Sequence, residues 1–366
     1  MHSDLLLVIV VGAALAFDFT NGFHDTANVV ASSISTRALS PRTAIALASI
    51  LNFAGAFISL KVAATVATGI VNTAQVTERI AFAALIGAIA WNLTTWAYGL
   101  PSSSSHALIG GVVGAVIAAV GGGGIRGQAL VADVLVPAVV APLLAFLVAG
   151  VSIVLIYRLV GHRRPGVVTR GFRLGQWVSG SMLALSHGTN DAQKTMGVIS
   201  LALVAHGDIS ARHFHVPPWV VIAAASAIAL GTYAGGWRII RTLGTRIIKM
   251  DPPQGFASQG AGAAVILASS HFGYPLSSTQ VIAGGIIGAG AAERVSAVRW
   301  GVAGNIVAAW MVTLPAAGAF GAFTYWISGV FGSGVQGPLV ISIVLLGALS
   351  VALNGRRRRI AQTPGP

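Results

Sequence analysis

Long apolar windows, separated by short polar segments, run along the whole chain. Residues 81–124 and 300–353 contain no Asp, Glu, Lys or Arg. Each window exceeds the roughly 20 apolar residues that one helix needs to cross a bilayer. Because such windows recur throughout, the pattern excludes a soluble domain with a single anchor. It predicts an all-α polytopic membrane protein with about 10–12 membrane helical segments.

Two apolar stretches are interrupted by a proline that is followed by hydroxyl residues. The interruptions read PSSSS at 101–105 and PLSST at 275–279. A proline breaks a helix, and unpaired backbone at membrane depth must line a cavity. The pattern favours two re-entrant helical hairpins with broken tips near the midplane, over 81–120 and 255–292. Two full crossings in each stretch fit the pattern as well and remain an alternative.

Two motifs occur twice, in the same order. GFHDTAN at 22–28 resembles GTNDAQK at 188–194, and PSSSSHALIGGVVGA at 101–115 resembles PLSSTQVIAGGIIGA at 275–289. Chance agreement of both motifs in order is improbable. The chain is therefore predicted to contain two related halves, an arrangement typical of secondary transporters.

The chain is strongly basic, with a net charge of +13 from 22 Lys and Arg against 9 Asp and Glu. The basic residues cluster in loops, as the positive-inside rule requires, so the charge needs no nucleic-acid partner. The basic loop 36–42 follows the first motif and is predicted to be cytoplasmic, whereas the weakly basic loop 206–218 follows the second and is predicted to be external. The two halves are therefore predicted to have inverted topology.

These observations predict a division of the chain into four parts. The first inverted repeat covers 1–157, a cytoplasmic basic linker 158–175, the second repeat with extra C-terminal helices 176–354, and a cytoplasmic tail 355–366. The first apolar run, 5–17, follows an acid rather than a basic segment, so it is expected to belong to the mature protein rather than to a cleaved signal peptide.

Asp25 and Asp191 occupy equivalent positions in the two halves. A carboxylate at bilayer depth costs at least about 2.5 kcal/mol, so such residues need a partner. Oxygen ligands suit a hard cation. The acids, helped by amides, are predicted to coordinate Na⁺ or bind a proton; a helix cap or an interhelical hydrogen bond is the structural alternative. The supporting amides are those of Asn21, Asn28 and Asn190.

Two hydroxyl clusters precede glycine-rich helix starts at equivalent positions. They comprise Ser103, Ser104 and Ser105 in the first half and Ser277, Ser278 and Thr279 in the second. Hydroxyls, free backbone N–H groups and a helix N-terminus together form an anion site. Serines in membrane helices also bond their own carbonyls, which is the alternative for each serine taken singly. The paired clusters favour an oxyanion site.

Five other polar residues need separate consideration. Lys194 replaces Asn28 in the second motif and either pairs with Asp191 or meets the anion. Asp18, whose counterpart is the uncharged Ala184, is expected at a helix end near the outer interface. His106 follows the first hydroxyl cluster, opposite Gln280 in the second, and either relays protons or serves as an interior hydrogen-bond donor. The same alternatives hold for His24 and His187.

The chain has no cysteine and none of the common catalytic motifs, so it is not expected to be an enzyme or to hold a resident cofactor. The only metal expected is Na⁺ at Asp25 and Asp191.

The duplicated motifs GFHDTAN and SHGTNDAQK, with WNLTTWAYGLPSSSSHALIG, GTYAGGWRIIRTLG and AWMVTLPAA, resemble the Pit inorganic phosphate transporters, in particular their bacterial low-affinity branch. The likeness covers nearly the whole chain. It implies a multi-pass homodimer in the cytoplasmic membrane that moves phosphate with Na⁺ or H⁺, or carries it as a metal-phosphate complex. Gln280 departs from the family, which often has His there, and the central hydrophilic loop is short.

The sequence therefore predicts a phosphate symporter. The hydroxyl clusters, with Lys194, are expected to bind phosphate, and the paired acids are expected to bind the coupling cation. A sulfate or other oxyanion permease on the same scaffold is the nearest alternative, and an anion channel is a remote one.

Overall fold

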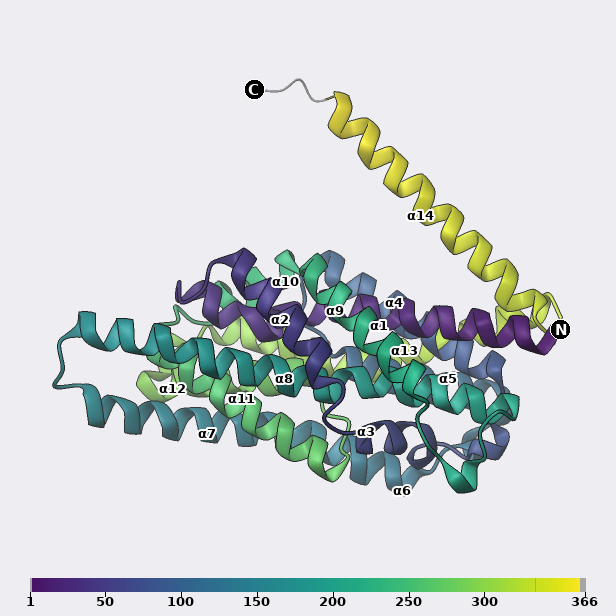
Figure 1. Cartoon of the computed structure of the whole chain (residues 1–366), viewed down its shortest axis with the longest axis horizontal. Helices are drawn as coiled ribbons and strands as arrows, with labels where there is room; N and C mark the ends of the chain where they lie inside the picture. Colours follow the sequence, from purple (N-terminus) through teal and green to yellow (C-terminus); the bar gives the residue numbers. More distant parts are fainter. Residues whose placement is uncertain (1, 333, 363–366) are drawn as a thin grey trace.

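The computed structural model describes the backbone of residues 2–332 and 334–362 and the side chains of residues 4–332 and 334–350. This part of the chain is helical, which confirms the all-α prediction (Figure 1). The α-helices are α1 (His2–Ser35), α2 (Pro41–Gly55), α3 (Lys61–Ala64), α4 (Glu78–Tyr98), α5 (Ser104–Val120), α6 (Gly127–Ala129), α7 (Val136–Val160), α8 (Pro165–His206), α9 (Pro218–Ala234), α10 (Trp237–Arg241), α11 (Pro252–Phe272), α12 (Ser278–Glu293), α13 (Trp300–Val330) and α14 (Gln336–Gln362). Short 3-10 and π turns join several of them.

Within the described residues, four segments are long and apolar enough to cross a membrane on their own. They are Asp4–Ser35, Glu78–Tyr98, Gly127–Val160 and Trp300–Val330. The pair Pro218–Ala234 and Trp237–Arg246, bent by 61°, makes a fifth if it is one broken span. The predicted number of segments also includes shorter and more polar helices, and it stays a prediction.

The segments α4–α5 and α11–α12 each form a helical hairpin with a break at its serine cluster. Whether these hairpins are re-entrant or cross the membrane fully stays a prediction. Figure 1 shows α5 toward one end of the long axis and α11 and α12 toward the other. The hairpin tips meet in the interior: the Ser105 hydroxyl donates to the Leu276 carbonyl at 3.0 Å, and Gln280 Nε2 lies 3.3 Å from His106 Nδ1. Two hairpins of related sequence thus bring their broken ends together.

Each hairpin packs on a long helix from the other half of the chain. Helix α5 packs on α13, and α12 packs on α7. A Cβ added at Gly110 of α5 would overlap the backbone oxygen of Leu314, and one added at Gly284 of α12 would overlap that of Pro142. The glycines shared by the two hairpin motifs therefore allow close helix approach. The two halves of the chain are therefore packed against each other. Their inverted topology stays a prediction.

The two helices that carry the acidic motifs lie in the centre of the molecule and pack on each other. Every residue of α8 from Ser186 to Leu203 is buried. The shared glycine of these motifs again marks a close approach, because a Cβ at Gly22 would overlap the backbone of Ile228 in α9 and one at Gly188 that of Asn52 in α2. Packing thus holds both acidic motifs in fixed positions.

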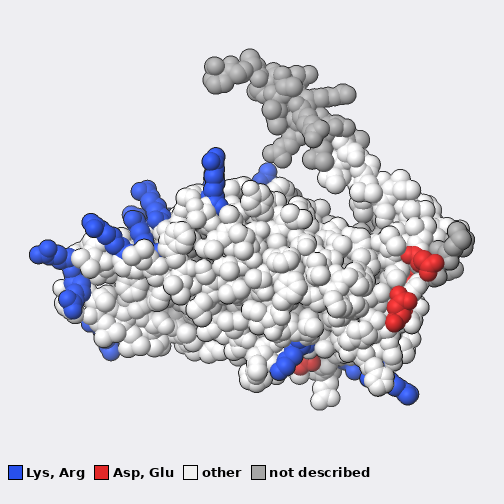
Figure 2. Space-filling model, in the orientation of Figure 1, with Lys and Arg blue, Asp and Glu red and all other residues white. Residues whose placement is uncertain are grey.

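Basic side chains gather at one end of the molecule, where α7 and α8 are joined (Figure 2). Arg158, Arg163 and Arg164 are exposed there. The predicted basic linker is helical on both sides of a short connection, residues 161–164. Of the predicted tail 355–366, the backbone is described as far as Gln362 within α14; residues 363–366 and all side chains after residue 350 lie outside the described part.

Candidate functional site

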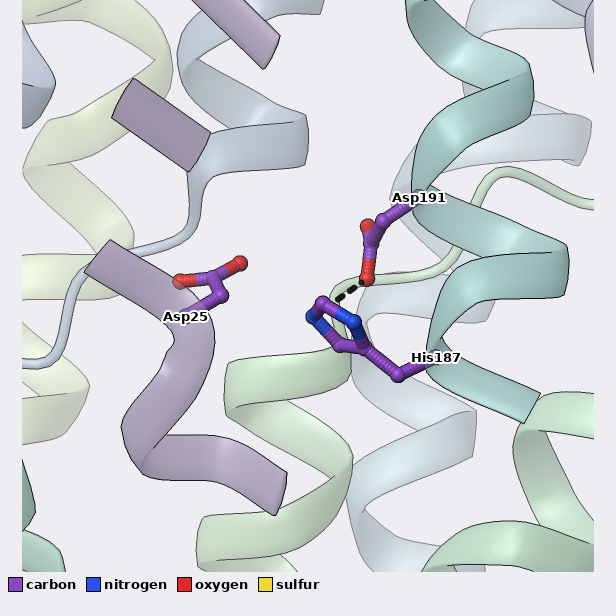
Figure 3. A group of neighbouring side chains, drawn as sticks. All are labelled: Asp25, His187 and Asp191. Atoms are coloured by element: carbon purple, nitrogen blue, oxygen red, sulfur yellow. Dashed lines mark ion pairs between the residues drawn. The ribbon is translucent and has the colours of Figure 1, made fainter. Parts of the chain in front are cut away.

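The two equivalent acids face each other between α1 and α8. Asp25 is 1% exposed and Asp191 is fully buried. Figure 3 shows their carboxylates turned toward the same space, with the His187 ring beside Asp191. One ligand atom from each of Asp25, His187 and Asp191 lies within 4.8 Å of the other two. A single cation placed among them could contact all three side chains.

Both hairpins contribute a hydroxyl to Asp25. Its Oδ1 atom accepts from Ser104 Oγ of α5 at 3.2 Å and from Thr279 Oγ1 of α12 at 3.3 Å. His24 Nδ1 lies 2.7 Å from the same oxygen. The structure thus brings together the first predicted acid and one residue from each predicted hydroxyl cluster.

Asp191 is paired with Lys194, three residues further along α8. The same ammonium donates to Ser105 Oγ at 2.6 Å and to the Leu276 carbonyl at 2.7 Å. An ammonium group has three N–H donors, so these contacts use all of them. Of the two alternatives for Lys194, the structure shows the pairing with the acid. Contact with phosphate stays a prediction.

The side chain at the last position of each acidic motif donates hydrogen bonds to the tip of a hairpin. In the first half, the Asn28 amide donates to Ser278 Oγ at 3.3 Å and to Thr279 Oγ1 at 2.9 Å. In the second half, Lys194 fills the matching position and holds Ser105 and the Leu276 carbonyl. The repeats therefore use the same position for the same task, but only the second repeat carries a fixed positive charge there.

A chain of oriented hydrogen bonds fixes the His187 ring. The Thr232 hydroxyl donates to the Ile228 carbonyl at 2.8 Å and accepts from the Asn52 amide nitrogen, also at 2.8 Å. Asn52 Oδ1 therefore faces His187 Nδ1, at 3.2 Å, as an acceptor. An acceptor requires a proton on Nδ1, which directs Nε2 at Asp191 Oδ2, 3.0 Å away. Two acceptor atoms this close favour a positively charged ligand between them.

Several residues of this network escaped the sequence reasoning. Ser102 donates to Thr95 Oγ1 at 2.7 Å, and His24 Nε2 lies 3.3 Å from the same atom. Ser102 begins the PSSSS run, and Thr95 and Asn52 are polar residues in apolar helices, so each carried a weak signal. No pattern in the sequence indicates which of them face the acids.

Three other predicted residues lie around the centre in different ways. Asn190 turns its amide nitrogen to Ser270 Oγ, 2.9 Å away, and so ties α8 to α11. Ser103 and Ser277 cap α5 and α12 by accepting from the backbone N–H groups of His106 and Gln280. These residues shape the site, and their contact with a ligand stays a prediction.

Asp18 does not lie at a helix end, so that expectation is wrong. Helix α1 runs without a break from His2 to Ser35, and Asp18 is fully buried within it. Neighbouring helices pack around this part of α1, so the helix continues past the acid. Asp18, Asn21 and Asp25 are three and four residues apart, so they share one face of α1.

A known protein family matches most of the chain in sequence. The sequence profile described as the phosphate transporter family matches residues 21–169 and 162–321. The chain belongs to the phosphate transporter family.

Curated relatives agree with the family assignment. A protein of Mycobacterium bovis named as a probable low-affinity inorganic phosphate transporter is 53% identical over 98% of this chain and 86% of its own. A protein of Bacillus subtilis with the same name is 41% identical over 88% of this chain and 97% of its own. Because the relatives are described as transporters, a non-enzymatic role is consistent with the comparisons.

A solved structure gives the same result for the fold. The protein titled the sodium-dependent phosphate transporter matches with a TM-score of 0.82 and 25% identity, over 88% of this chain and 98% of the other. Family membership and this likeness support an all-helical, multi-pass membrane protein and the resemblance to Pit transporters noted from the motifs.

A separate polar cluster lies at the end of α8, away from the paired acids. His206 Nδ1 is 2.6 Å from the Glu78 carboxylate at the start of α4. With Arg79 and Tyr325, these residues line a cavity of about 370 Å³. The cluster joins the ends of α8 and α4 and takes no part in the contacts described above.

Proposed function

We propose that the protein imports inorganic phosphate across the cytoplasmic membrane by symport with a cation, Na⁺ or H⁺. One observation carries this proposal: hydroxyls from both hairpin tips converge on the paired carboxylates of α1 and α8. Ser104 and Thr279 reach Asp25, and Ser105 lies 3.4 Å from Asp191. An anion site and a cation site therefore share the same residues.

The hairpin tips have the chemistry to hold a tetrahedral oxyanion. Helices α5 and α12 begin at Ser104 and Ser278, so the positive ends of two helix dipoles point into the interior. Hydroxyls that donate to a carboxylate can donate to a phosphate oxygen instead. The phosphate ligands we propose are the six hydroxyls of the two clusters, with the Lys194 ammonium beside them.

The charges of the buried centre make a cation necessary. This centre holds three buried acids, Asp18, Asp25 and Asp191, and one buried lysine, Lys194. Adding a phosphate dianion to this centre without counterions would cost many kcal/mol. Cations bound at Asp25 and Asp191, next to Asn21, Asn28 and Asn190, remove that cost and couple the two fluxes.

Two observations bear on the identity of the cation. The structural relative is titled a sodium-dependent transporter, which favours Na⁺. The cluster of Asp25, His187 and Asp191 combines carboxylate oxygens with an imidazole nitrogen, a set that also accepts a divalent metal ion. It would suit phosphate that travels as a metal-phosphate complex.

Sulfate is the main competing substrate, because hydroxyls and amides discriminate poorly between tetrahedral anions. A carboxylate close to the anion can accept a proton from phosphate but not from sulfate, so the paired acids favour phosphate. The test is binding of labelled phosphate to the purified protein with sulfate as competitor. We expect displacement by phosphate and arsenate but not by sulfate. Equal displacement by sulfate would make the protein a general oxyanion permease.

The resemblance also leads us to propose a homodimer in the cytoplasmic membrane. The molar mass of the protein in detergent, measured by light scattering, tests the oligomeric state. Membrane fractionation of the expressing cell tests the location. A monomer across the working range of concentration would remove the dimer from this proposal and leave the transport function unchanged.

A further inference from the structure

Asp18 is a buried acid for which the contacts around the paired acids give no role. Both of its carboxylate oxygens lack a hydrogen-bond partner, and so do Asn21 Oδ1 and Thr195 Oγ1. All three side chains are at most 1% exposed. Buried polar atoms are almost always paired, so four unpaired oxygens in neighbouring side chains need an explanation.

These oxygens belong to one place between α1 and α8. Asn21 lies one turn after Asp18 on the same face of α1, and Thr195 is on α8, which packs against it. Asn21 and Thr195 are the neutral side chains that interact directly with the Asp18 carboxylate. Neither makes a hydrogen bond of ordinary geometry to it. Unpaired oxygens gathered in one buried place can act together as ligands of an ion.

The charged groups that reach Asp18 leave its negative charge uncompensated. Asp191 and Lys194, both on α8, are the charged side chains that act on it. They are paired with each other, so their effects on Asp18 largely cancel. A buried carboxylate without a counterion is strongly disfavoured.

We propose that Asp18, Asn21 and Thr195 form a binding site for Na⁺. The set offers a carboxylate, an amide oxygen and a hydroxyl, which are ligands for a hard monovalent cation. A proton on Asp18 would satisfy one acceptor oxygen and leave the others unpaired, whereas Na⁺ can contact all of them. This set is present in one half only, because Ala184 stands at the position equivalent to Asp18.

The proposed Na⁺ site lies nearer the start of α1 than Asp25, the acid that both hairpin tips contact. Asp18 precedes Asp25 by seven residues, about 10 Å along the helix, toward the N-terminal end of α1. A cation held there would bring the charge of the centre closer to neutral before phosphate binds. This inference rests on the proposed function for its role in coupling, but Na⁺ binding itself does not depend on it.

The test measures thermal unfolding of the full-length protein in detergent while Na⁺ replaces choline, without and then with phosphate. We expect Na⁺ to stabilise the protein in the absence of phosphate. In Asp18→Asn this stabilisation should be much smaller, and what remains is the part due to Na⁺ at Asp25 and Asp191. Thr195→Val removes one neutral ligand. It should raise the Na⁺ concentration that gives half of the full stabilisation by about tenfold, which corresponds to about 1.4 kcal/mol. Asp208→Asn, which alters an exposed acid, is the matched control and should behave as the unaltered protein.

Each outcome decides the proposal. Unchanged Na⁺ stabilisation in both Asp18→Asn and Thr195→Val overturns the site, and so does stability that responds to pH but not to Na⁺. If Asp18→Asn does not fold, the Thr195→Val titration decides alone. Stabilisation by phosphate is read in the same experiment: its absence in the unaltered protein would contradict the proposed function, whatever the response to Na⁺.

Discussion

Replacing Lys194 by methionine tests whether its ammonium is the counterion of Asp191. The change removes the ion pair with Asp191 and the bonds to Ser105 and the Leu276 carbonyl, while keeping the length of the side chain. Leu276 retains the bond from Ser105, so the main loss falls on the carboxylate. Leaving one charge of a buried pair without its partner typically costs about 3–5 kcal/mol.

The assay is thermal unfolding in detergent at one scan rate, for the single variant and for the double variant Lys194→Met/Asp191→Asn. The single variant should unfold on the order of 4–7 °C lower. The double variant should recover most of the loss, because neither side chain is then charged. Phosphate accumulation should be lost in both variants, since Asp191 is part of the proposed cation site. A single variant as stable as the unaltered protein, or a double variant no better than the single, would refute the pairing argument.

Three further predictions follow from other parts of the structure. Gly188→Ala should destabilise the protein by at least about 2 kcal/mol because its methyl group would overlap the Asn52 backbone, whereas Gly260→Ala, with open space around it, should not lower the unfolding temperature. Thr279→Val should weaken phosphate binding roughly tenfold in equilibrium titrations, through loss of one hydroxyl donor; unchanged affinity would remove that hydroxyl from the cradle. The Glu78 carboxylate raises the pKa of His206 at the C-terminal end of α8, so the contact should stabilise the fold at low pH and be lost as pH rises above about 6.5 through the raised pKa; an unfolding temperature with the same pH dependence in His206→Gln would contradict this.

Much of the site could be predicted because duplication makes it visible in the sequence. Asp25 and Asp191 stand out as equivalent acids in apolar surroundings, and both serine clusters follow helix-breaking prolines. In the structure, hydroxyls from both hairpin tips reach Asp25. These features depend on local signals that survive in a single chain: charge, proline and spacing.

The remaining features depend on tertiary packing that no local signal encodes. Asn52 and Thr232 orient His187 only because α2 and α9 pack beside the two motif helices. Asp18 was expected at a helix end, yet packing keeps α1 continuous and buries the acid. For Lys194, two partners were compatible with the sequence, and only the distances to Asp191 and Ser105 distinguish them.

Uptake of labelled phosphate into proteoliposomes tests the central claim most directly. The purified protein is reconstituted, and Na⁺ and pH gradients are imposed one at a time, with Asp25→Asn as the inactive comparison. The account predicts that one inward cation gradient drives phosphate above its external concentration, and that Asp25→Asn abolishes this accumulation. Phosphate that only equilibrates, at a rate independent of both gradients, would contradict symport and would make the protein a passive anion pathway.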